Sequence, residues 1–151
     1  MRYFLILACV SLMYTTISSQ ANSKFTVPDP VKAKIAKLYP NTSPKWEMED
    51  GIYEATFKQN NVETSVLLSS DGSVIETETE MSPSLLPQTI KDYVLSKVPG
   101  KTITSASKIV DARSSIKYEA EVDKTDYLFD ANGNFIQKVD AEEGEEDDDD
   151  D

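Results

Sequence analysis

Hydrophobic and polar residues alternate along much of the chain, with the period of a β-strand whose two faces have different surroundings. The first clear case covers residues 52–59, where Tyr53, Ala55 and Phe57 alternate with polar residues. Similar stretches follow at short intervals, separated by Asp-Gly, Asn-Asn and Asn-Gly dipeptides that favour tight turns. This pattern predicts consecutive hairpins, so the strands should form an antiparallel meander.

The period changes to that of a helix just before the first strands. Apolar residues there recur at spacings of three and four, which places them on one helical stripe: Val31, Ile35 and Leu38. We expect Asp29 to cap this helix and Pro30 to occupy its first position. The helix should end near Tyr39, because Pro40 disfavours helical geometry in the residue before it. Strands are then expected at residues 43–49, 52–59, 62–70 and 73–81.

The whole order of patterns then begins again. Residues 86–100 match residues 27–41 at an offset of 59, and the tripeptide Tyr-Glu-Ala of residues 53–55 returns at residues 118–120. The matching helix is followed by four more expected strands, at residues 101–110, 116–122, 126–129 and 134–139.

These patterns predict an α+β fold of two tandem repeats, each a helix plus a four-stranded antiparallel meander. The first repeat covers about residues 27–81 and the second about residues 86–139. A single unit would have open sheet edges and a thin core, whereas two units that share an edge would roughly double the buried apolar area. We expect both helices on one face of the sheet and solvent on the other.

The N-terminal segment, residues 1–21, has the order of a secretory signal peptide. Arg2 is followed by an apolar run and then a polar Thr/Ser stretch, and small side chains allow cleavage before Asn22. The apolar run is shorter than the roughly 20 residues that a membrane span needs. A lipoprotein signal processed at Cys9 is the alternative. Both forms predict a secreted or periplasmic protein whose domain covers residues 22–139.

Most of the net charge lies in one terminal segment. The chain carries −12, but residues 140–151 hold ten acidic residues and no basic one, so the other residues carry only about −2. This charge disfavours nucleic acid and anionic lipid as partners, and we expect no membrane insertion after signal cleavage. The tail should be disordered. It would keep the protein soluble, bind divalent cations weakly or dock on a basic protein.

The composition removes several kinds of chemistry. The chain has no histidine, and its one cysteine, Cys9, lies in the predicted signal peptide. We therefore expect no disulfide, thiolate nucleophile, cofactor, Cys/His metal site or Ser-His-Asp triad. Residues 130–134 are typical of a hairpin turn, although they also resemble the start of a calcium loop. A carboxylate hydrolase is a further alternative, with four acids close in sequence: Glu47, Glu49, Asp50 and Glu54.

An ordered set of residues, found in both halves, resembles a known family. In the first half it comprises Pro28, Tyr39, Pro40, Trp46, Tyr53, Glu54, Ala55, Phe57, Asp71 and Gly72, and in the second Pro87, Pro99, Tyr118, Glu119, Ala120 and Gly133. The set is similar to the PepSY-like, or beta-lactamase-inhibitor-protein-like (BLIP-like), domains of secreted Bacteroidota proteins. The resemblance covers residues 27–139 and implies an exported α+β module with a binding or inhibitory role. The second half has no tryptophan matching Trp46. The resemblance implies no particular inhibitory contact and no particular target enzyme for this chain.

The strand periods also separate a core face from a polar face. Trp46, Tyr53 and Tyr118 should pack beneath the helices. The polar residues of the two Tyr-Glu-Ala strands should share the other face as a partner-facing surface: Glu54, Thr56, Lys58, Lys117, Glu119 and Glu121. Within residues 73–81, three glutamates also point to one side: Glu76, Glu78 and Glu80. Such a face can dock a protein by charge complementarity, although alternating charges on a solvated sheet need no partner.

Together these features predict a secreted, non-enzymatic protein-binding module. In its narrower form the module would inhibit an envelope or extracellular enzyme. The alternative is an acidic protein that associates with cations or surfaces through its tail.

Overall fold

The computed structural model describes residues 25–140 of the chain. The predicted signal peptide and the acidic residues that follow Asp140 lie outside this range. Within the described range, no helix is both long enough and apolar enough to cross a membrane.

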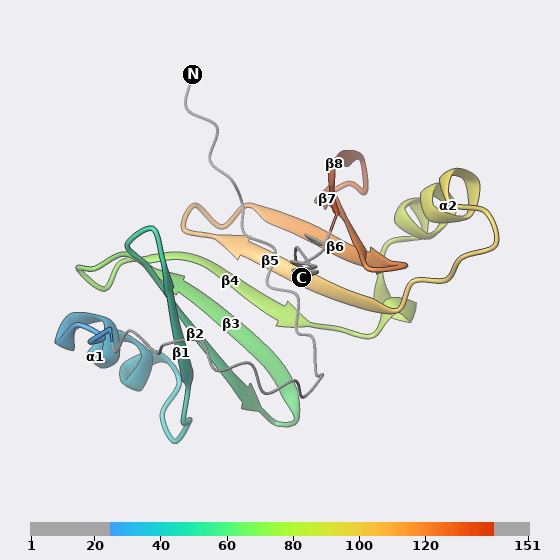
Figure 1. Ribbon diagram of the computed structural model, residues 1–151. Coiled ribbons are helices and arrows are strands. Elements are labelled where there is room, and N and C mark those ends of the chain that lie inside the picture. The colour runs from blue at the N-terminus through green and yellow to red at the C-terminus, as the bar shows by residue number, and fades with distance from the viewer. Residues whose placement is uncertain (1–24, 141–151) are drawn as a thin grey trace, which may run out of the picture.

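Two helices and one eight-stranded antiparallel sheet make up the fold (Figure 1). The first half contains α1 (Asp29–Leu38), β1 (Lys45–Glu49), β2 (Ile52–Gln59), β3 (Val62–Leu68) and β4 (Val74–Glu80). A short 3-10 turn, η1 (Pro83–Leu85), precedes α2 (Gln88–Lys97), β5 (Ser105–Asp111), β6 (Ile116–Val122), β7 (Thr125–Asp130) and β8 (Phe135–Asp140). The strands lie in the sheet in chain order, from β1 to β8. The predicted α+β class and antiparallel meander are confirmed.

The start of α1 differs from the prediction. The cap is Pro28, whose carbonyl accepts hydrogen bonds from the N–H groups of Val31 and Lys32, both at 3.1 Å. Asp29 is the first helical residue, and its side chain makes no capping bond but lies 3.8 Å from the Lys32 Nζ. Pro30 is tolerated at the second position because N–H groups of the first turn have no partner inside a helix. The prediction that Asp29 caps the helix is therefore wrong by one residue.

The end of α1 follows the prediction. The helix stops at Leu38, and the Tyr39 N–H still donates to the Ile35 carbonyl at 2.8 Å. Pro40 follows directly, and a residue that precedes a proline is disfavoured from helical geometry. The chain then turns back toward β1.

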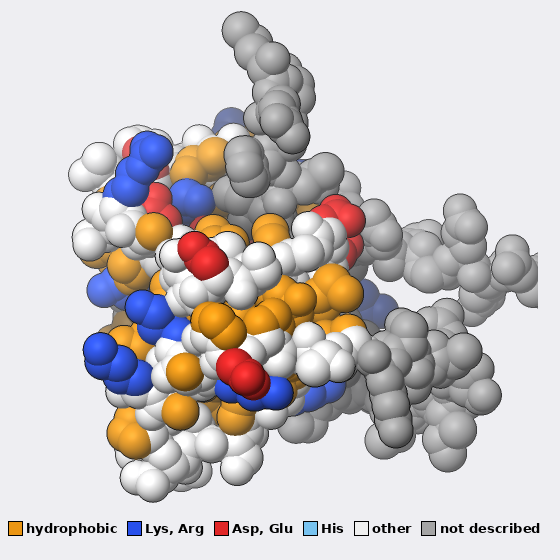
Figure 2. All heavy atoms as spheres, turned by 90° about the vertical axis from the view of Figure 1, so that its left-hand side faces the viewer, with side chains coloured by type: hydrophobic (Ala, Val, Ile, Leu, Met, Phe, Trp, Pro, Cys, Tyr) orange, Lys and Arg blue, Asp and Glu red, His pale blue; other side chains and the backbone are white. Residues whose placement is uncertain are grey.

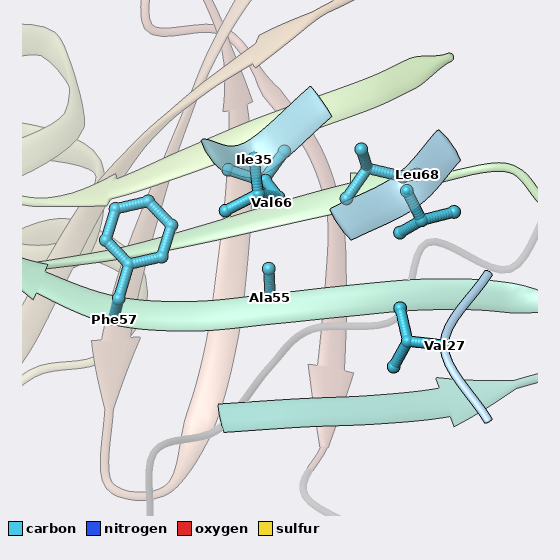
Figure 3. Close-up of a cluster of buried hydrophobic side chains, with 7 residues drawn as sticks. Val27, Ile35, Ala55, Phe57, Val66 and Leu68 are labelled. Atoms are coloured by element: carbon cyan, nitrogen blue, oxygen red, sulfur yellow. The ribbon is translucent and has the colours of Figure 1, made fainter. Parts of the chain in front are cut away.

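The first core lies between α1 and strands β2 and β3. Figure 3 shows Ile35 of the helix above Val66, with Ala55, Phe57 and Leu68 pointing to the same side. Each buried aliphatic side chain contributes about 1.5–3 kcal/mol relative to exposure. This packing stabilises a helix of only ten residues, which would be marginal alone. Partly buried side chains surround the cluster: Tyr39, Trp46, Tyr53 and Val74.

The second core lies beneath α2 and has a more aromatic character. Its buried members are Leu86, Ile90, Ala106, Ala120 and Phe129, and Tyr118 packs against them. Tyr93 of α2 meets Phe129 edge-on at 5.3 Å and stacks on Phe135 at 5.0 Å. The core positions predicted for Trp46, Tyr53 and Tyr118 are confirmed, since each packs against one of the two clusters.

Pairing of β4 with β5 joins the two halves into one sheet. Thr77 is opposite both Val66 of β3 and Val110 of β5, so these three residues share a face. Val66 belongs to the first core, and Val110 has the same parity along β5 as Ala106 of the second core. Both helices therefore pack on the same face, near its two ends (Figure 1).

The turn between β3 and β4 docks directly on the start of α1. The Gly72 N–H donates to the Ser69 carbonyl at 2.9 Å, and Gly72 has a φ of +84°, which side chains other than that of glycine rarely allow. A Cβ at this position would lie 2.7 Å from the Pro30 carbonyl oxygen. Because that oxygen is backbone, neither partner can move without shifting the helix.

We predict that Gly72→Ala lowers the free energy of unfolding by about 2–4 kcal/mol, through both strain at positive φ and overlap with Pro30. Gly51→Ala is the matched control, because Gly51 also has positive φ, at +80°, but a Cβ there would meet nothing within 4 Å. The control should lose only about 1–2 kcal/mol. Urea unfolding of both variants measures the difference, and equal losses would contradict the proposed overlap.

Candidate functional site

The six residues predicted to form a partner-facing surface all lie on the face opposite the helices. On β2 and β6 they alternate with the core residues Ala55 and Ala120, which point toward the helices. Three strands separate β2 from β6 in the sheet. At about 4.8 Å per strand, the two groups of three lie roughly 19 Å apart. The residues thus share a face without forming a single contact cluster.

Exposure differs widely among these six residues. Glu54 and Glu119 are buried, at 6% and 9% exposure, which differs from the expected open surface. Thr56, Lys117 and Glu121 are half-buried, and Lys58 is exposed. The buried carboxylates lie in the middle of their strands, between neighbours on both sides. Their role in contacting a partner remains a prediction.

Hydrogen bonds order the part of this face that lies over β2 and β3. The Thr56 hydroxyl donates to the Glu54 Oε1 at 3.2 Å and lies 2.9 Å from the Ser65 hydroxyl. At the end of the same strand, the Lys58 Nζ is 3.9 Å from the Glu63 Oε2. Side chains of neighbouring strands therefore hold one another in place before any partner arrives.

Two further glutamates, Glu76 and Glu78 of β4, lie between the two predicted groups. Leu67 is the cross-strand partner of both Glu54 and Glu76, so these carboxylates point to the same side of the sheet. Glu76 and Glu78 alternate in sequence, which already indicated a shared side. Their position beside Glu119 required the pairing of β4 with β5, which sequence alone did not provide.

Asp126 of β7 completes the acidic set at the other side of β6. Its cross-strand partner is Glu121, and it is buried at 4% exposure. Sequence reasoning missed Asp126, although its place in a strand with period two was a usable signal. We use the name acidic face for six of the carboxylates on this side of the sheet: Glu54, Glu76, Glu78, Glu119, Glu121 and Asp126.

Burial makes several of these carboxyl groups weak acids. It raises the pKa of Glu78 to about 7, although a hydrogen bond with Ser107 acts in the opposite direction. Burial, followed by the charge of Glu78, raises the pKa of Glu119 to about 9. Burial and the charge of Glu121 raise the pKa of Asp126 to about 6. Desolvation disfavours the charged form, and neighbouring carboxylates add to the effect.

One lysine partly compensates for this charge. The Lys117 Nζ lies 3.7 Å from the Glu76 Oε2, and both side chains are largely buried. Burial raises the pKa of Glu76, whereas the charge of Lys117 lowers it. The acidic face is partly protonated near neutral pH, because the pKa of Glu78 is about 7 and that of Glu119 is about 9. It therefore gains or loses protons when the pH changes.

The other acids singled out in the sequence have ordinary structural positions. Glu47 faces Glu54 across β1 and β2, but it is exposed and its Oε1 lies 2.6 Å from the Lys45 Nζ. Glu49 and Asp50 are exposed at the hairpin that follows. Within residues 25–140, no group of three or more acidic, histidine or cysteine side chains is arranged to hold a metal ion.

The turn at residues 130–134 is a hairpin, as one of the two interpretations predicted. The Asp130 carboxylate accepts hydrogen bonds from the N–H groups of Asn132 and Asn134, at 2.8 and 2.9 Å. Bonds from the Asn134 side chain and backbone lower the pKa of Asp130 most. The oxygens that a calcium loop would use are thus engaged by the turn itself.

Solved structures with the same fold come from several Bacteroides species. A protein from Bacteroides eggerthii, provisionally described as periplasmic, has a TM-score of 0.68 and 17% identity, over 76% of this chain and 89% of its own. A DUF2874 family protein from Bacteroides ovatus has a TM-score of 0.65 and 19% identity, over 77% and 89%. A BLIP-like protein from Bacteroides fragilis has a TM-score of 0.61 and 21% identity, over 82% and 93%.

At these identities the similarity shows a shared fold, and for the fold the predicted resemblance to BLIP-like proteins is confirmed. No family model and no curated protein matches the sequence.

We predict that the protein is most stable near pH 5 and loses stability toward pH 9. The folded-state pKa values of Glu78, Glu119 and Asp126 lie above the ordinary values of 4.5, 4.5 and 3.8. The unfolded chain therefore releases these protons first as pH rises, and unfolding becomes easier until the folded pKa values are passed. Below about pH 4.5, acids with lowered pKa become protonated and stability falls again: Asp71, Asp111, Asp123 and Asp130. Urea unfolding across this range measures the profile.

Glu78→Gln should raise the free energy of unfolding at pH 8 by about 1–3 kcal/mol and flatten the profile above pH 5, because the buried charge is removed. Glu80→Gln is the control, since Glu80 follows two residues later on β4 and is exposed. A stability that rises from pH 5 to pH 8 in the unchanged protein would contradict the burial of these carboxyl groups.

Proposed function

We propose that this chain is an exported, periplasmic and non-enzymatic protein-binding module that contacts its partner through the acidic face and the three neighbouring residues Thr56, Lys58 and Lys117. The shared fold with a BLIP-like protein and with proteins provisionally described as periplasmic supports this proposal. The predicted signal peptide is consistent with export. In its narrower form, the module inhibits an extracellular or envelope enzyme.

The single observation that carries the proposal is a polar sheet face held in one arrangement. Its side chains lie on hydrogen-bonded strands, and the Thr56 hydroxyl forms hydrogen bonds with both Glu54 and Ser65. A surface that is already ordered loses little conformational freedom when a partner binds. Polar groups in fixed positions also favour one partner over others through charge complementarity.

The composition supports a role without catalysis. The chain has no histidine and one cysteine, which lies within the predicted signal peptide. The two carboxylates whose pKa is raised to about 7 and about 9, Glu78 and Glu119, come from strands β4 and β6, and burial is the main cause of both shifts. Burial and neighbouring charges shift pKa values in a binding surface just as they do in an active site. The raised pKa values therefore do not by themselves require catalysis.

We further infer that the two halves of the chain are copies of one unit. The turns before β4 and β8 support this, because they have matching hydrogen bonds: Ser69 to Ser73 at 3.0 Å, and Asp130 to Asn134 at 2.9 Å. Each turn contains a glycine of nearly equal φ, +84° at Gly72 and +83° at Gly133. Both glycines abut the first turn of their helix, at Pro30 and Thr89 respectively.

We expect a partner captured from a Bacteroides periplasmic extract to be lost when charges on the proposed surface are reversed. The test variant combines Lys58→Glu with Glu121→Lys, which leaves the net charge unchanged. The matched control combines Lys37→Glu with Asp92→Lys, two exposed positions on the helices. Recovery of the partner, measured by quantitative mass spectrometry, should fall at least about tenfold for the test variant only.

Circular dichroism and urea unfolding of both variants establish that they are folded. Equal recovery by the test variant and the unchanged protein would overturn the proposed surface. A failure of all three proteins to retain any specific partner would instead overturn the binding function.

A further inference from the structure

In the first half of the sheet, a pair of hydroxyl groups supports the buried glutamate of the Tyr-Glu-Ala strand. Glu54 of β2 is opposite Leu67, and two residues further along β2, Thr56 is opposite Ser65. The Thr56 hydroxyl donates to the Glu54 Oε1 at 3.2 Å and lies 2.9 Å from the Ser65 hydroxyl. The buried carboxylate therefore has a donor on its own strand.

The second half has the same strand register but carries acids at both positions of that pair. Glu119 of β6 is opposite Leu128, and two residues further along, Glu121 is opposite Asp126. Hydroxyl groups can donate, whereas ionised carboxylates only accept. Within residues 25–140, the carboxyl groups of Glu119 and Asp126 have neither a hydrogen bond nor an ion pair, although only 9% and 4% of these residues is exposed. Burial, followed by the charges of neighbouring acids, raises the pKa of both groups.

Glu119, Glu121 and Asp126 form a compact triangle on one side of the sheet. Residues two apart on a strand are separated by about 7 Å, directly opposite residues by about 5 Å and diagonal neighbours by about 7–8 Å. The three residues have these three relations. Every fully buried side-chain oxygen of the described residues has a hydrogen-bond partner, so the unbonded oxygens of Glu119 and Asp126 keep some contact with solvent. Glu121 is half-buried, and the triangle opens to solvent beside it.

Acids outnumber lysines around this triangle. The other charged residues on this side of strands β4–β8 are Glu76, Glu78, Glu80, Asp111, Lys117 and Asp130. The Lys117 Nζ lies 3.7 Å from the Glu76 Oε2. In the turn after β6, Lys124 is exposed and the Asp123 Oδ2 lies 2.8 Å from the Lys101 Nζ. The triangle is therefore short of positive charge, and a cation that donates hydrogen bonds would stabilise its ionised form.

We propose that Glu119, Glu121 and Asp126 bind the ammonium or guanidinium group of a lysine or arginine that the protein partner inserts into the acidic face. This inference rests on the proposed function, because it names the group that the partner presents. Both groups carry several N–H donors and a positive charge on a long stem, and their charge-assisted bonds to carboxylates are strong. The inserted group supplies the donors that Thr56 and Ser65 supply in the first half.

NMR of the side-chain carboxyl carbons of the full chain tests this site. The probe is propylguanidinium, and the control is tetramethylammonium, which has the charge but no N–H donor. Propylguanidinium should shift the Glu119 and Asp126 signals with a dissociation constant of about 10–100 mM at pH 8, and tetramethylammonium should bind at least about tenfold more weakly. Because the cation competes with protons for the carboxyl groups, propylguanidinium should also bind at least about tenfold more weakly at pH 6 than at pH 8.

Exchanging acids for hydroxyl residues locates the site. Glu121→Thr combined with Asp126→Ser gives the second half the hydroxyl pair of the first, and it should weaken propylguanidinium binding at least about tenfold. Glu47→Thr combined with Glu49→Ser removes the same charge from exposed positions of β1 and should leave binding within about twofold. Glu119→Gln, which keeps the size of the side chain, is the second test variant. The site is overturned if the folded test variants bind as tightly as the unchanged protein, or if tetramethylammonium binds as tightly as propylguanidinium.

Capture from the periplasmic extract separates this inference from the proposed function. Glu119→Gln should lower recovery of the partner at least about tenfold. Full recovery by Glu119→Gln, together with loss of the partner by the variant that combines Lys58→Glu with Glu121→Lys, would overturn the cation site and leave the binding function. Failure of the unchanged protein to retain any specific partner would overturn the proposed function, and with it the role of the site in recognition.

Discussion

The antiparallel pairing of β4 with β5 is the constraint on which the rest of the structure depends. Beyond the strand register itself, the Met81 N–H donates to the Ala106 carbonyl and the Ala112 N–H donates to the Ile75 carbonyl, both at 2.9 Å. These bonds continue the pairing by one residue beyond each end of the registered stretch, which runs from Glu76 opposite Asp111 to Glu80 opposite Ser107. Because side chains alternate strictly along a strand, one register decides the face of every residue on both sides of the junction. A slip of one residue would place the α2 core on the face opposite α1.

This register gives the sheet two faces that contribute differently to the stability of the fold. On the helix face, small residues such as Ala55 and Ala120 allow the helices to approach, and burial of aliphatic and aromatic groups stabilises the fold. On the other face, carboxylates lie close enough for their charges to shift one another: the charge of Glu78 raises the pKa of Glu119, and that of Glu76 raises the pKa of Glu78. Burying charge opposes folding, so these residues are not explained by stability. Local conflicts of this kind are expected where a surface serves function, which agrees with the proposed binding role.

The sheet also ends differently on its two sides. At β1, Trp46 packs against the first core while charged neighbours face outward. At β8, Phe135 packs instead within an aromatic group that includes Tyr93 of α2. The two helices therefore pack on similar halves of one sheet, but the side chains of the outer strand differ between the halves. The difference gives the two outer strands different surroundings, although each half has one α-helix followed by four strands.

The sequence by itself determined the elements and their faces. A period of two placed Tyr53 and Glu54 on opposite sides of β2, and Pro40 ended α1, because both effects act between residues close in the chain. Local reasoning erred at Asp29, where the Pro28 carbonyl accepts the first helical bonds. It also could not predict the burial of Glu54 and Glu119 or the proximity of Glu78 to Glu119. The burial of Glu54 and Glu119 depends on packing against the strands on either side, and the proximity of Glu78 to Glu119 arises from the registers of β4 with β5 and of β5 with β6, so only the tertiary structure decides these features.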